Sequence, residues 1–136
     1  MDVISNGRAI LGAGVGWWPE EFAAAGQEFG NRGPRTTEIT TILRRLWTEE
    51  AVEHHGKFYD FPEVRLEPKP VQQPIPIIFG GNSGAALRRA AREGDGWMPA
   101  YLPYDELIAG VNKVNGFREE YDRGDHPFEI TAALPF

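Results

Sequence analysis

The stretch that decides the fold runs from residue 75 to residue 100 and reads IPIIFGGNSGAALRRAAREGDGWMPA. Its first part, residues 75–79, is short and apolar, which is typical of a strand buried on both faces. A tight turn at 80–83 offers polar side chains that can cap an Ala-rich helix over residues 84–92. The Gly-Asp-Gly sequence at 94–96 ends that helix, and residues 97–100 form a second short strand. A strand, a helix and a strand in this order predict parallel pairing through a right-handed crossover.

Similar elements flank this stretch on both sides. Residues 8–15 are apolar and interrupted by glycine, which predicts another buried strand, and residues 128–136 are expected to form a closing strand. A short helix is expected to begin at Pro19, because proline suits the first turn of a helix. The alternation of strands and helices indicates an α/β fold with a parallel sheet.

Two longer helices are predicted from their apolar periodicity. Residues 36–48 carry apolar side chains at i, i+3, i+4, i+7 and i+8, namely Ile39, Ile42, Leu43, Leu46 and Trp47. A helix from Pro103 to about Arg123 is expected to bury Leu107, Ile108, Val111, Val114 and Tyr121. Between the first of these helices and the central strand, residues 51–66 predict a small hairpin around Gly56, followed by a proline-rich extended linker.

Composition excludes several classes of protein. The chain has 136 residues, which suits one domain, and a net charge of −6, which argues against a nucleic-acid groove. It has no cysteine, so disulfides, thiolate metal sites and cysteine nucleophiles are excluded. Its apolar runs are shorter than a membrane span, and the N-terminus lacks the features of a signal peptide. The expectation is a soluble cytoplasmic protein without a membrane or nucleic-acid partner.

Several short motifs, in their order and spacing, resemble the bacterial-luciferase-like (LLM class) monooxygenases. The run DVISNGRAILGAGVGW at residues 2–17 is similar to the fourth-strand signature of that family. Further matches are FGNRGPR at 29–35, GKFY at 56–59, PKPVQ at 68–72, GGNS at 80–83 and GDGW at 94–97. The subgroup that the chain resembles most is that of the coenzyme F420-dependent oxidoreductases, with flavin-dependent relatives close behind.

The resemblance implies a partial TIM-barrel-like (β/α)8 fold. A complete barrel has eight strands and about 250 residues. The chain corresponds to barrel strands four to seven, so we expect residues 1–136 to form one domain of about half a barrel. The expected half-barrel consists of parallel strands with flanking helices and a small β-hairpin excursion. The chain is expected to be a truncation or a fragment.

The resemblance also implies a cofactor site at the turn after residue 79. Glycines let backbone N–H groups approach an anion, and a helix N-terminus adds positive potential. In the family this place is similar to the pocket for the cofactor phosphate, of coenzyme F420 or alternatively of FMN. The residues implied are Gly80, Gly81, Asn82 and Ser83. An ordinary capped turn is the alternative that the local pattern alone favours.

The glycines before Trp17 do not form a dinucleotide-binding motif. In the spacing Gly-x-Gly-x-x-Gly, the third glycine would fall on Trp17 or on Pro19. Gly14 and Gly16 are instead expected either to leave room for the planar cofactor ring or to allow tight packing. Trp17 follows the strand where barrel enzymes place active-site groups, so it is a candidate for the substrate pocket or a rim aromatic.

No catalytic or metal-binding residue is assigned from the sequence. The histidines, His54, His55 and His126, are expected to be exposed, because none has a partner at metal-ligand spacing. Asp95 is interpreted as a turn residue rather than a site carboxylate. Arg35 and Glu38, three residues apart on a helix, are expected to pair.

Two hypotheses for function follow. The first is an oxidoreductase or monooxygenase that uses coenzyme F420 or FMN to oxidise or reduce a small organic substrate. The second is a non-catalytic half-barrel remnant that self-associates or binds a complementary half-barrel, because its edge strands, 8–15 and 128–136, would lie unpaired. A sugar-phosphate TIM-barrel enzyme fits the turn but not the luciferase-like motifs.

Overall fold

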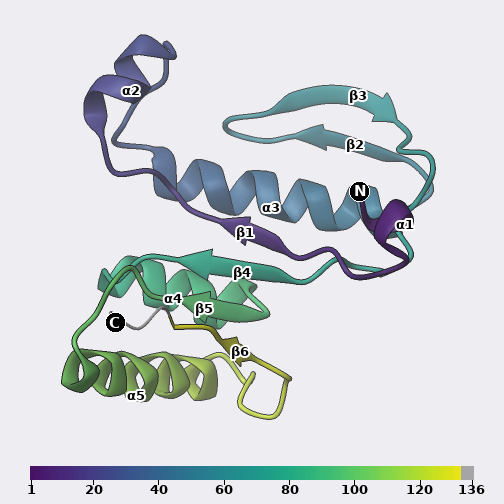
Figure 1. Cartoon of the computed structure of the whole chain (residues 1–136). Helices are drawn as coiled ribbons and strands as arrows, with labels where there is room; N and C mark the ends of the chain where they lie inside the picture. Colours follow the sequence, from purple (N-terminus) through teal and green to yellow (C-terminus); the bar gives the residue numbers. More distant parts are fainter. Residues whose placement is uncertain (133–136) are drawn as a thin grey trace. The chain divides into compact units, whose positions relative to one another are not determined.

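The computed structural model describes residues 1–132, and these divide into two compact units. The sheet unit comprises Ile10–Gly14 and the chain from Pro76 onward, and the hairpin unit comprises Met1–Ala9 and Val15–Ile75. Figure 1 shows the elements of each unit along the chain. Within the described residues, no helix is long and apolar enough to cross a membrane.

The sheet unit is built on four parallel strands, as the strand–helix alternation predicts. The strands are β1 (Leu11–Ala13), β4 (Ile77–Gly80), β5 (Gly96–Met98) and β6 (Glu129–Ile130), in the spatial order β1-β4-β5-β6. The connecting helices are α4 (Gly84–Glu93) and α5 (Tyr104–Glu120). This confirms the α/β class with a parallel sheet, and the strands pair with neighbours as successive barrel strands do.

Within the described residues both edge ladders are short, and a proline limits each of them at one end. Leu11 donates its N–H to the carbonyl of Pro76, but Pro76 has no N–H with which to extend the ladder before β1. Thr131 donates to the carbonyl of Trp97, and Pro99 cannot donate back. The predicted strand 8–15 therefore contracts to three residues, and of residues 128–132 only Glu129 and Ile130 form a strand. Residues 133–136 of the second prediction lie outside the described part of the chain.

The core of the sheet unit lies where β4 and β5 face the two helices. Trp97 and Val114 are completely buried, and Phe79 is nearly so. The buried face of α5 differs from the prediction, because Ile108 is 42% exposed and Gly110 is buried in its place. A Cβ atom built on Gly110 would lie 2.5 Å from Cη2 of Trp97. The indole therefore packs directly on the helix backbone and determines which face of α5 is buried.

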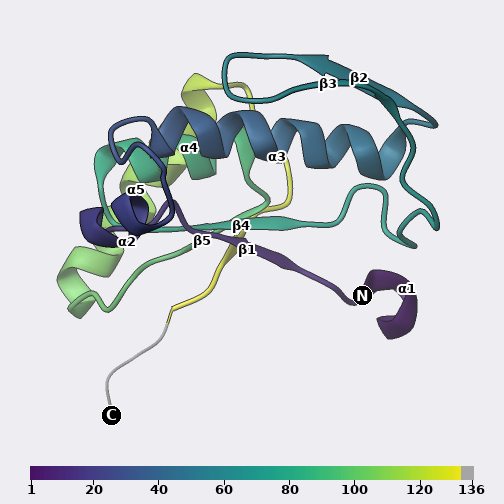
Figure 2. The same cartoon turned by 90° about the horizontal axis from the view of Figure 1, so that it is seen from above.

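The hairpin unit is built around one long helix. It contains α1 (Asp2–Ser5), α2 (Pro19–Ala24), α3 (Arg32–Thr48) and the antiparallel hairpin of β2 (Val52–His55) and β3 (Asp60–Val64). Figures 1 and 2 both show the hairpin running alongside α3. The amphipathic helix and the hairpin match the predicted elements, whereas α1 was not predicted from the sequence. Its Asp2 carboxylate is buried and accepts hydrogen bonds from the backbone N–H groups of Ala9 and Gln72.

The sequence predicted that Glu38 pairs with Arg35. Instead, the carboxylate of Glu38 binds the β2–β3 hairpin to α3. Its carboxylate accepts hydrogen bonds from the backbone N–H groups of Phe58, at 3.1 Å, and Tyr59, at 2.9 Å. Nε2 of His54 lies 3.1 Å from the same carboxylate, so His54 is largely buried and the expectation that it is exposed was wrong. Arg35 donates instead to the side-chain oxygen of Gln27.

The Glu38 contacts predict acid sensitivity of the hairpin unit. Burial raises the pKa of Glu38, but the hydrogen bonds from Phe58, Tyr59 and His54 outweigh it and hold the pKa below its ordinary value. A carboxyl whose pKa is lower in the folded state stabilises the fold above the unfolded pKa of about 4.3. That stabilisation is lost as pH falls through the lower, folded-state pKa.

We expect the melting temperature of the wild-type chain, followed by circular dichroism, to fall more steeply below about pH 4.3 than that of Glu38→Gln. The carboxamide has no titration in this range, and it presents only one acceptor to the two amides. Glu53→Gln, an exposed change on the same hairpin, is the matched control and should keep the wild-type profile. Parallel pH profiles for wild type and Glu38→Gln would contradict the role given to Glu38.

Candidate functional site at the carboxyl edge of the sheet

The parallel strands bring three chain segments to one edge of the sheet. Ala13 is in register with Phe79, and Gly80 is in register with Met98. The residues that follow the three strands, Gly14, Gly81 and Pro99, therefore emerge side by side. In parallel α/β folds, ligands bind at this edge, where the carboxyl ends of the strands open into loops.

The Gly80–Ser83 turn is fixed to strand β5 by two hydrogen bonds. The N–H of Gly81 donates to the carbonyl of Met98 at 3.3 Å, and Nε1 of Trp97 donates to the carbonyl of Gly81 at 2.8 Å. Gly81 has a φ of +109°, a conformation that side chains rarely adopt, and a Cβ there would lie 3.2 Å from Cβ of Ala86. The turn therefore requires glycine at position 81.

Ser83 caps helix α4, which agrees with the capped turn, one of the two interpretations of residues 80–83 that the sequence left open. Its Oγ accepts a hydrogen bond from the N–H of Ala86 at 3.2 Å, and its carbonyl accepts from Leu87. The N–H groups of the first helical residues, Gly84 and Ala85, have no hydrogen-bond partner within residues 1–132. These donors, together with the positive end of the helix dipole, favour an anion at the turn.

The side chain of Asn82 joins two loops at this edge. Its Nδ2 donates to the carbonyl of Ala100 at 2.7 Å, and its Oδ1 accepts from the N–H of Ala100 at 2.9 Å. The amide group is thus fully engaged with the loop after β5. The backbone N–H of Asn82 is the group that can still donate to a ligand, whereas its side chain positions the loop after β5.

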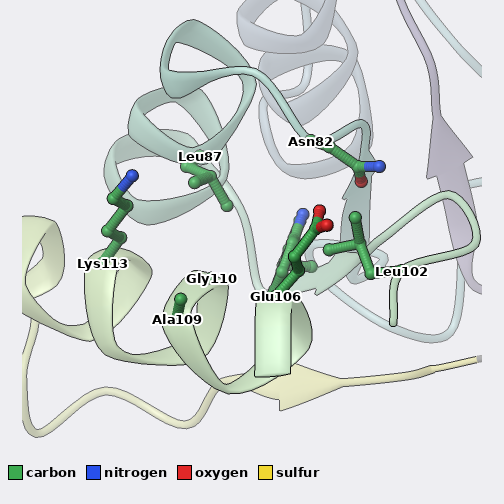
Figure 3. Close-up of a pocket in the computed structure, with 8 residues that line it drawn as sticks. Asn82, Leu87, Leu102, Glu106, Ala109, Gly110 and Lys113 are labelled. Carbon is green, nitrogen blue, oxygen red and sulfur yellow. The ribbon is translucent and has the colours of Figure 1, made fainter. Parts of the chain in front are cut away.

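A cavity of about 190 Å³ lies beside the turn, lined by side chains of α4, β5 and α5. Figure 3 shows Asn82, Leu102 and Glu106 on one side and Leu87 and Lys113 on the other. Trp97 also lines the cavity. One acidic and one basic group border it, so the cavity adds no net positive charge to the turn.

Basic side chains near α4 serve the packing of the helices. Arg88 lies over the ring of Phe117 at 3.9 Å and pairs with Glu120 at 3.1 Å. Hydrogen bonding to Tyr121 and then to Glu120 raises the pKa of Arg88 above its ordinary value. This guanidinium is committed to α5, so the attraction of an anion to the turn depends mainly on backbone N–H groups.

The remaining sequence candidates fall in different surroundings. Gly14 lies at the sheet edge, and a Cβ there would meet nothing within 4 Å, so the space beside it is open. Gly16 belongs to the hairpin unit, has a φ of +81° and leaves space for the ring of Phe22. Trp17 is 80% exposed and stacks on Trp18, with ring centroids 6.0 Å apart.

Asp95 has the structural role that the sequence favoured. Its carboxylate accepts from the N–H of Ile77 at 2.9 Å, and its own N–H donates to the carbonyl of Ile77. His55 is exposed and pairs with Asp60, and His126 is exposed in a loop. Within residues 1–132, no three metal-ligating side chains gather into a cluster.

Several proteins of known sequence are similar to the chain. The chain is 46% identical over 130 residues to an uncharacterized protein of Mycobacterium tuberculosis, covering 96% of this chain and 44% of that protein. It is 31% identical to an FMNH2-dependent dimethylsulfone monooxygenase of Pseudomonas putida, covering 96% of this chain and 36% of that enzyme. It is 34% identical to an F420-dependent glucose-6-phosphate dehydrogenase of Amycolatopsis mediterranei, covering 72% of this chain and 30% of that enzyme. The chain thus spans less than half the length of each relative.

Solved structures show the same fold. A monooxygenase from Streptomyces bottropensis superposes with a TM-score of 0.77 at 28% identity, covering 98% of this chain and 41% of the other. An F420-dependent secondary alcohol dehydrogenase superposes with a TM-score of 0.83 at 21% identity, covering 95% and 40%. Because these luciferase-like enzymes are TIM barrels, the chain has a partial TIM-barrel fold. The profile of the luciferase-like monooxygenases matches residues 1–136, and the chain belongs to this family.

Proposed function

We propose that the chain carries the phosphate-binding part of an oxidoreductase that acts on a small organic substrate with coenzyme F420, or alternatively FMN. The observation that supports this most is the Gly80–Ser83 turn, which presents backbone donors at a helix start on the carboxyl edge of a parallel sheet. Relatives that use each cofactor are similar to the chain. The assignment of Gly80, Gly81, Asn82 and Ser83 to the cofactor is part of this proposal.

The residues present fit a phosphate group. A side chain at position 81 would meet Cβ of Ala86 at 3.2 Å, so glycine allows the turn to lie close to the start of α4. The N–H groups of Gly84 and Ala85 supply donors, and the open space beside Gly14 suits a flat ring. When bound, the cofactor would supply the hydride or oxygen chemistry, whereas these residues hold its anionic end. Trp17, an exposed aromatic in the hairpin unit, is proposed as a substrate contact.

The test is a titration of the chain with FMN and with F420, each followed by its own fluorescence. We expect binding of both to be weak, because the chain spans less than half of its relatives. Riboflavin, which lacks the phosphate, should bind more weakly than FMN, and inorganic phosphate should compete with FMN. Failure of both cofactors to bind, or equal affinities for riboflavin and FMN, would contradict a phosphate site at this turn.

A second candidate function is that of an assembly partner, and the strand order favours it. Within residues 1–132, β1 pairs only with β4 and β6 pairs only with β5, so each strand has one open edge. Open edges of parallel strands are sites for pairing with another chain. The partner is either a second copy of the chain or a complementary half-barrel. For self-association, we expect the sedimentation coefficient of the chain alone to rise with protein concentration. A monomer throughout the range measured by analytical ultracentrifugation would contradict self-association.

A further inference from the structure

Tyr101 occupies a strained and exposed position at the carboxyl edge of the sheet. It follows β5 in the loop that leads to α5, its side chain is 83% exposed, and its φ is +34°. Positive φ values are uncommon for bulky residues, and such strain persists where the surrounding structure enforces it. No packing of the ring in the interior accounts for this conformation, because the ring is in solvent.

The residue before Tyr101 is held in place, and the residue after it lines the small cavity. Ala100 makes two hydrogen bonds with the side chain of Asn82, at 2.7 and 2.9 Å. Leu102 lines the small cavity together with Asn82 and Glu106, as Figure 3 shows. The backbone is therefore anchored at the residue before Tyr101, and the exposed ring of Tyr101 extends from this anchored point.

We propose that Tyr101 contacts the planar ring of the cofactor and that Asn82 is its positioning residue. This inference rests on the proposed function. The turn after β4 and the loop after β5 are neighbours at the sheet edge and are joined by the Asn82–Ala100 pair. A cofactor held by its phosphate at the turn extends along this edge, where an exposed aromatic ring offers a stacking surface.

The test compares Tyr101→Leu with Tyr104→Leu in an FMN titration. Tyr104 is 70% exposed at the start of α5, and its φ is negative, so it is the matched control. We expect Tyr101→Leu to raise the Kd for FMN by about two- to tenfold, the range of an aromatic contact. A tyrosine in contact with a flavin ring quenches its fluorescence, so the residual fluorescence at saturation should rise as well. Tyr104→Leu should change neither quantity.

The role of Asn82 is tested by a double-mutant cycle. Asn82→Ala should raise the fluorescence of bound FMN, and Tyr101→Leu should then add little further change, because the two residues act through one loop. Circular dichroism checks the fold. If Asn82→Ala does not fold, Asn82→Asp replaces it. Its protonated acid can donate to Ala100, so quenching should return at low pH.

The outcomes separate this inference from the proposed function. If the wild-type chain binds neither FMN nor F420, both fail. If the wild type binds and Tyr101→Leu binds with the same Kd and the same quenching, the phosphate site stands and Tyr101 has no contact with the ring. Additive effects of Asn82→Ala and Tyr101→Leu would overturn the positioning role of Asn82.

Discussion

Replacing Gly81 with Val is expected to weaken FMN binding by more than about tenfold, because the change strains the turn and crowds Ala86 at the start of α4. The φ of +109° is unfavourable for a β-branched residue, and the new Cβ would lie 3.2 Å from Cβ of Ala86. Relief of this strain must rotate the two peptide groups that flank Gly81, of which the first donates its N–H to Met98 and the second accepts from Trp97 through its carbonyl. The backbone donors at the start of α4 would then lose their alignment.

A glycine outside the proposed phosphate site provides the control for this prediction. A Cβ on Gly116, which lies in α5, would meet nothing within 4 Å. Gly116→Ala should therefore retain FMN affinity within about twofold, a difference of less than 0.5 kcal/mol by the usual conversion. Gly81→Val that is folded by circular dichroism and binds FMN as the wild type does would remove the turn from the site.

The elements around the Gly80–Ser83 turn were predicted well from the sequence, because each depends on residues that are close to it along the chain. Ser83 stands three residues before the amide that it caps, and the Ala-rich segment that follows has strong helix propensity. The helix observed, Gly84–Glu93, differs from the predicted one by a single residue. The shortening of both edge strands was also readable in principle, because Pro76 and Pro99 lack the N–H groups that longer ladders need.

The contacts that shape the site could not be predicted in the same way. Asn82 and Ala100 are 18 residues apart, and Glu38 and Phe58 are 20 residues apart. Neither pair has a spacing that local periodicity can reveal, because the partners meet only after the strands have paired. The positive φ of Tyr101 was likewise not predicted, because a tyrosine in a loop gives no sequence signal for that conformation.

Trp97 is expected to be the most important single side chain for the stability of the sheet unit. It is completely buried, its Nε1 donates to Gly81, and its ring lies against the backbone of α5 at Gly110. Truncation of a buried aromatic costs about 3–5 kcal/mol, a large part of the 5–15 kcal/mol that is typical for a domain. Trp97→Ala should therefore lower the urea midpoint strongly or leave the sheet unit unfolded.

Two further variants separate packing from hydrogen bonding at Trp97. Trp97→Phe retains an aromatic ring but loses the bond to Gly81, so its cost should be smaller. Gly110→Ala alone should destabilise, because its Cβ would lie 2.5 Å from Cη2 of Trp97. In the Trp97→Phe background that atom is absent, and the same change should become neutral or stabilising, since alanine is favoured over glycine in a helix by about 1 kcal/mol. Urea unfolding followed by circular dichroism measures this coupling. If Gly110→Ala has the same effect in both backgrounds, the indole does not set the approach of α5 to the sheet.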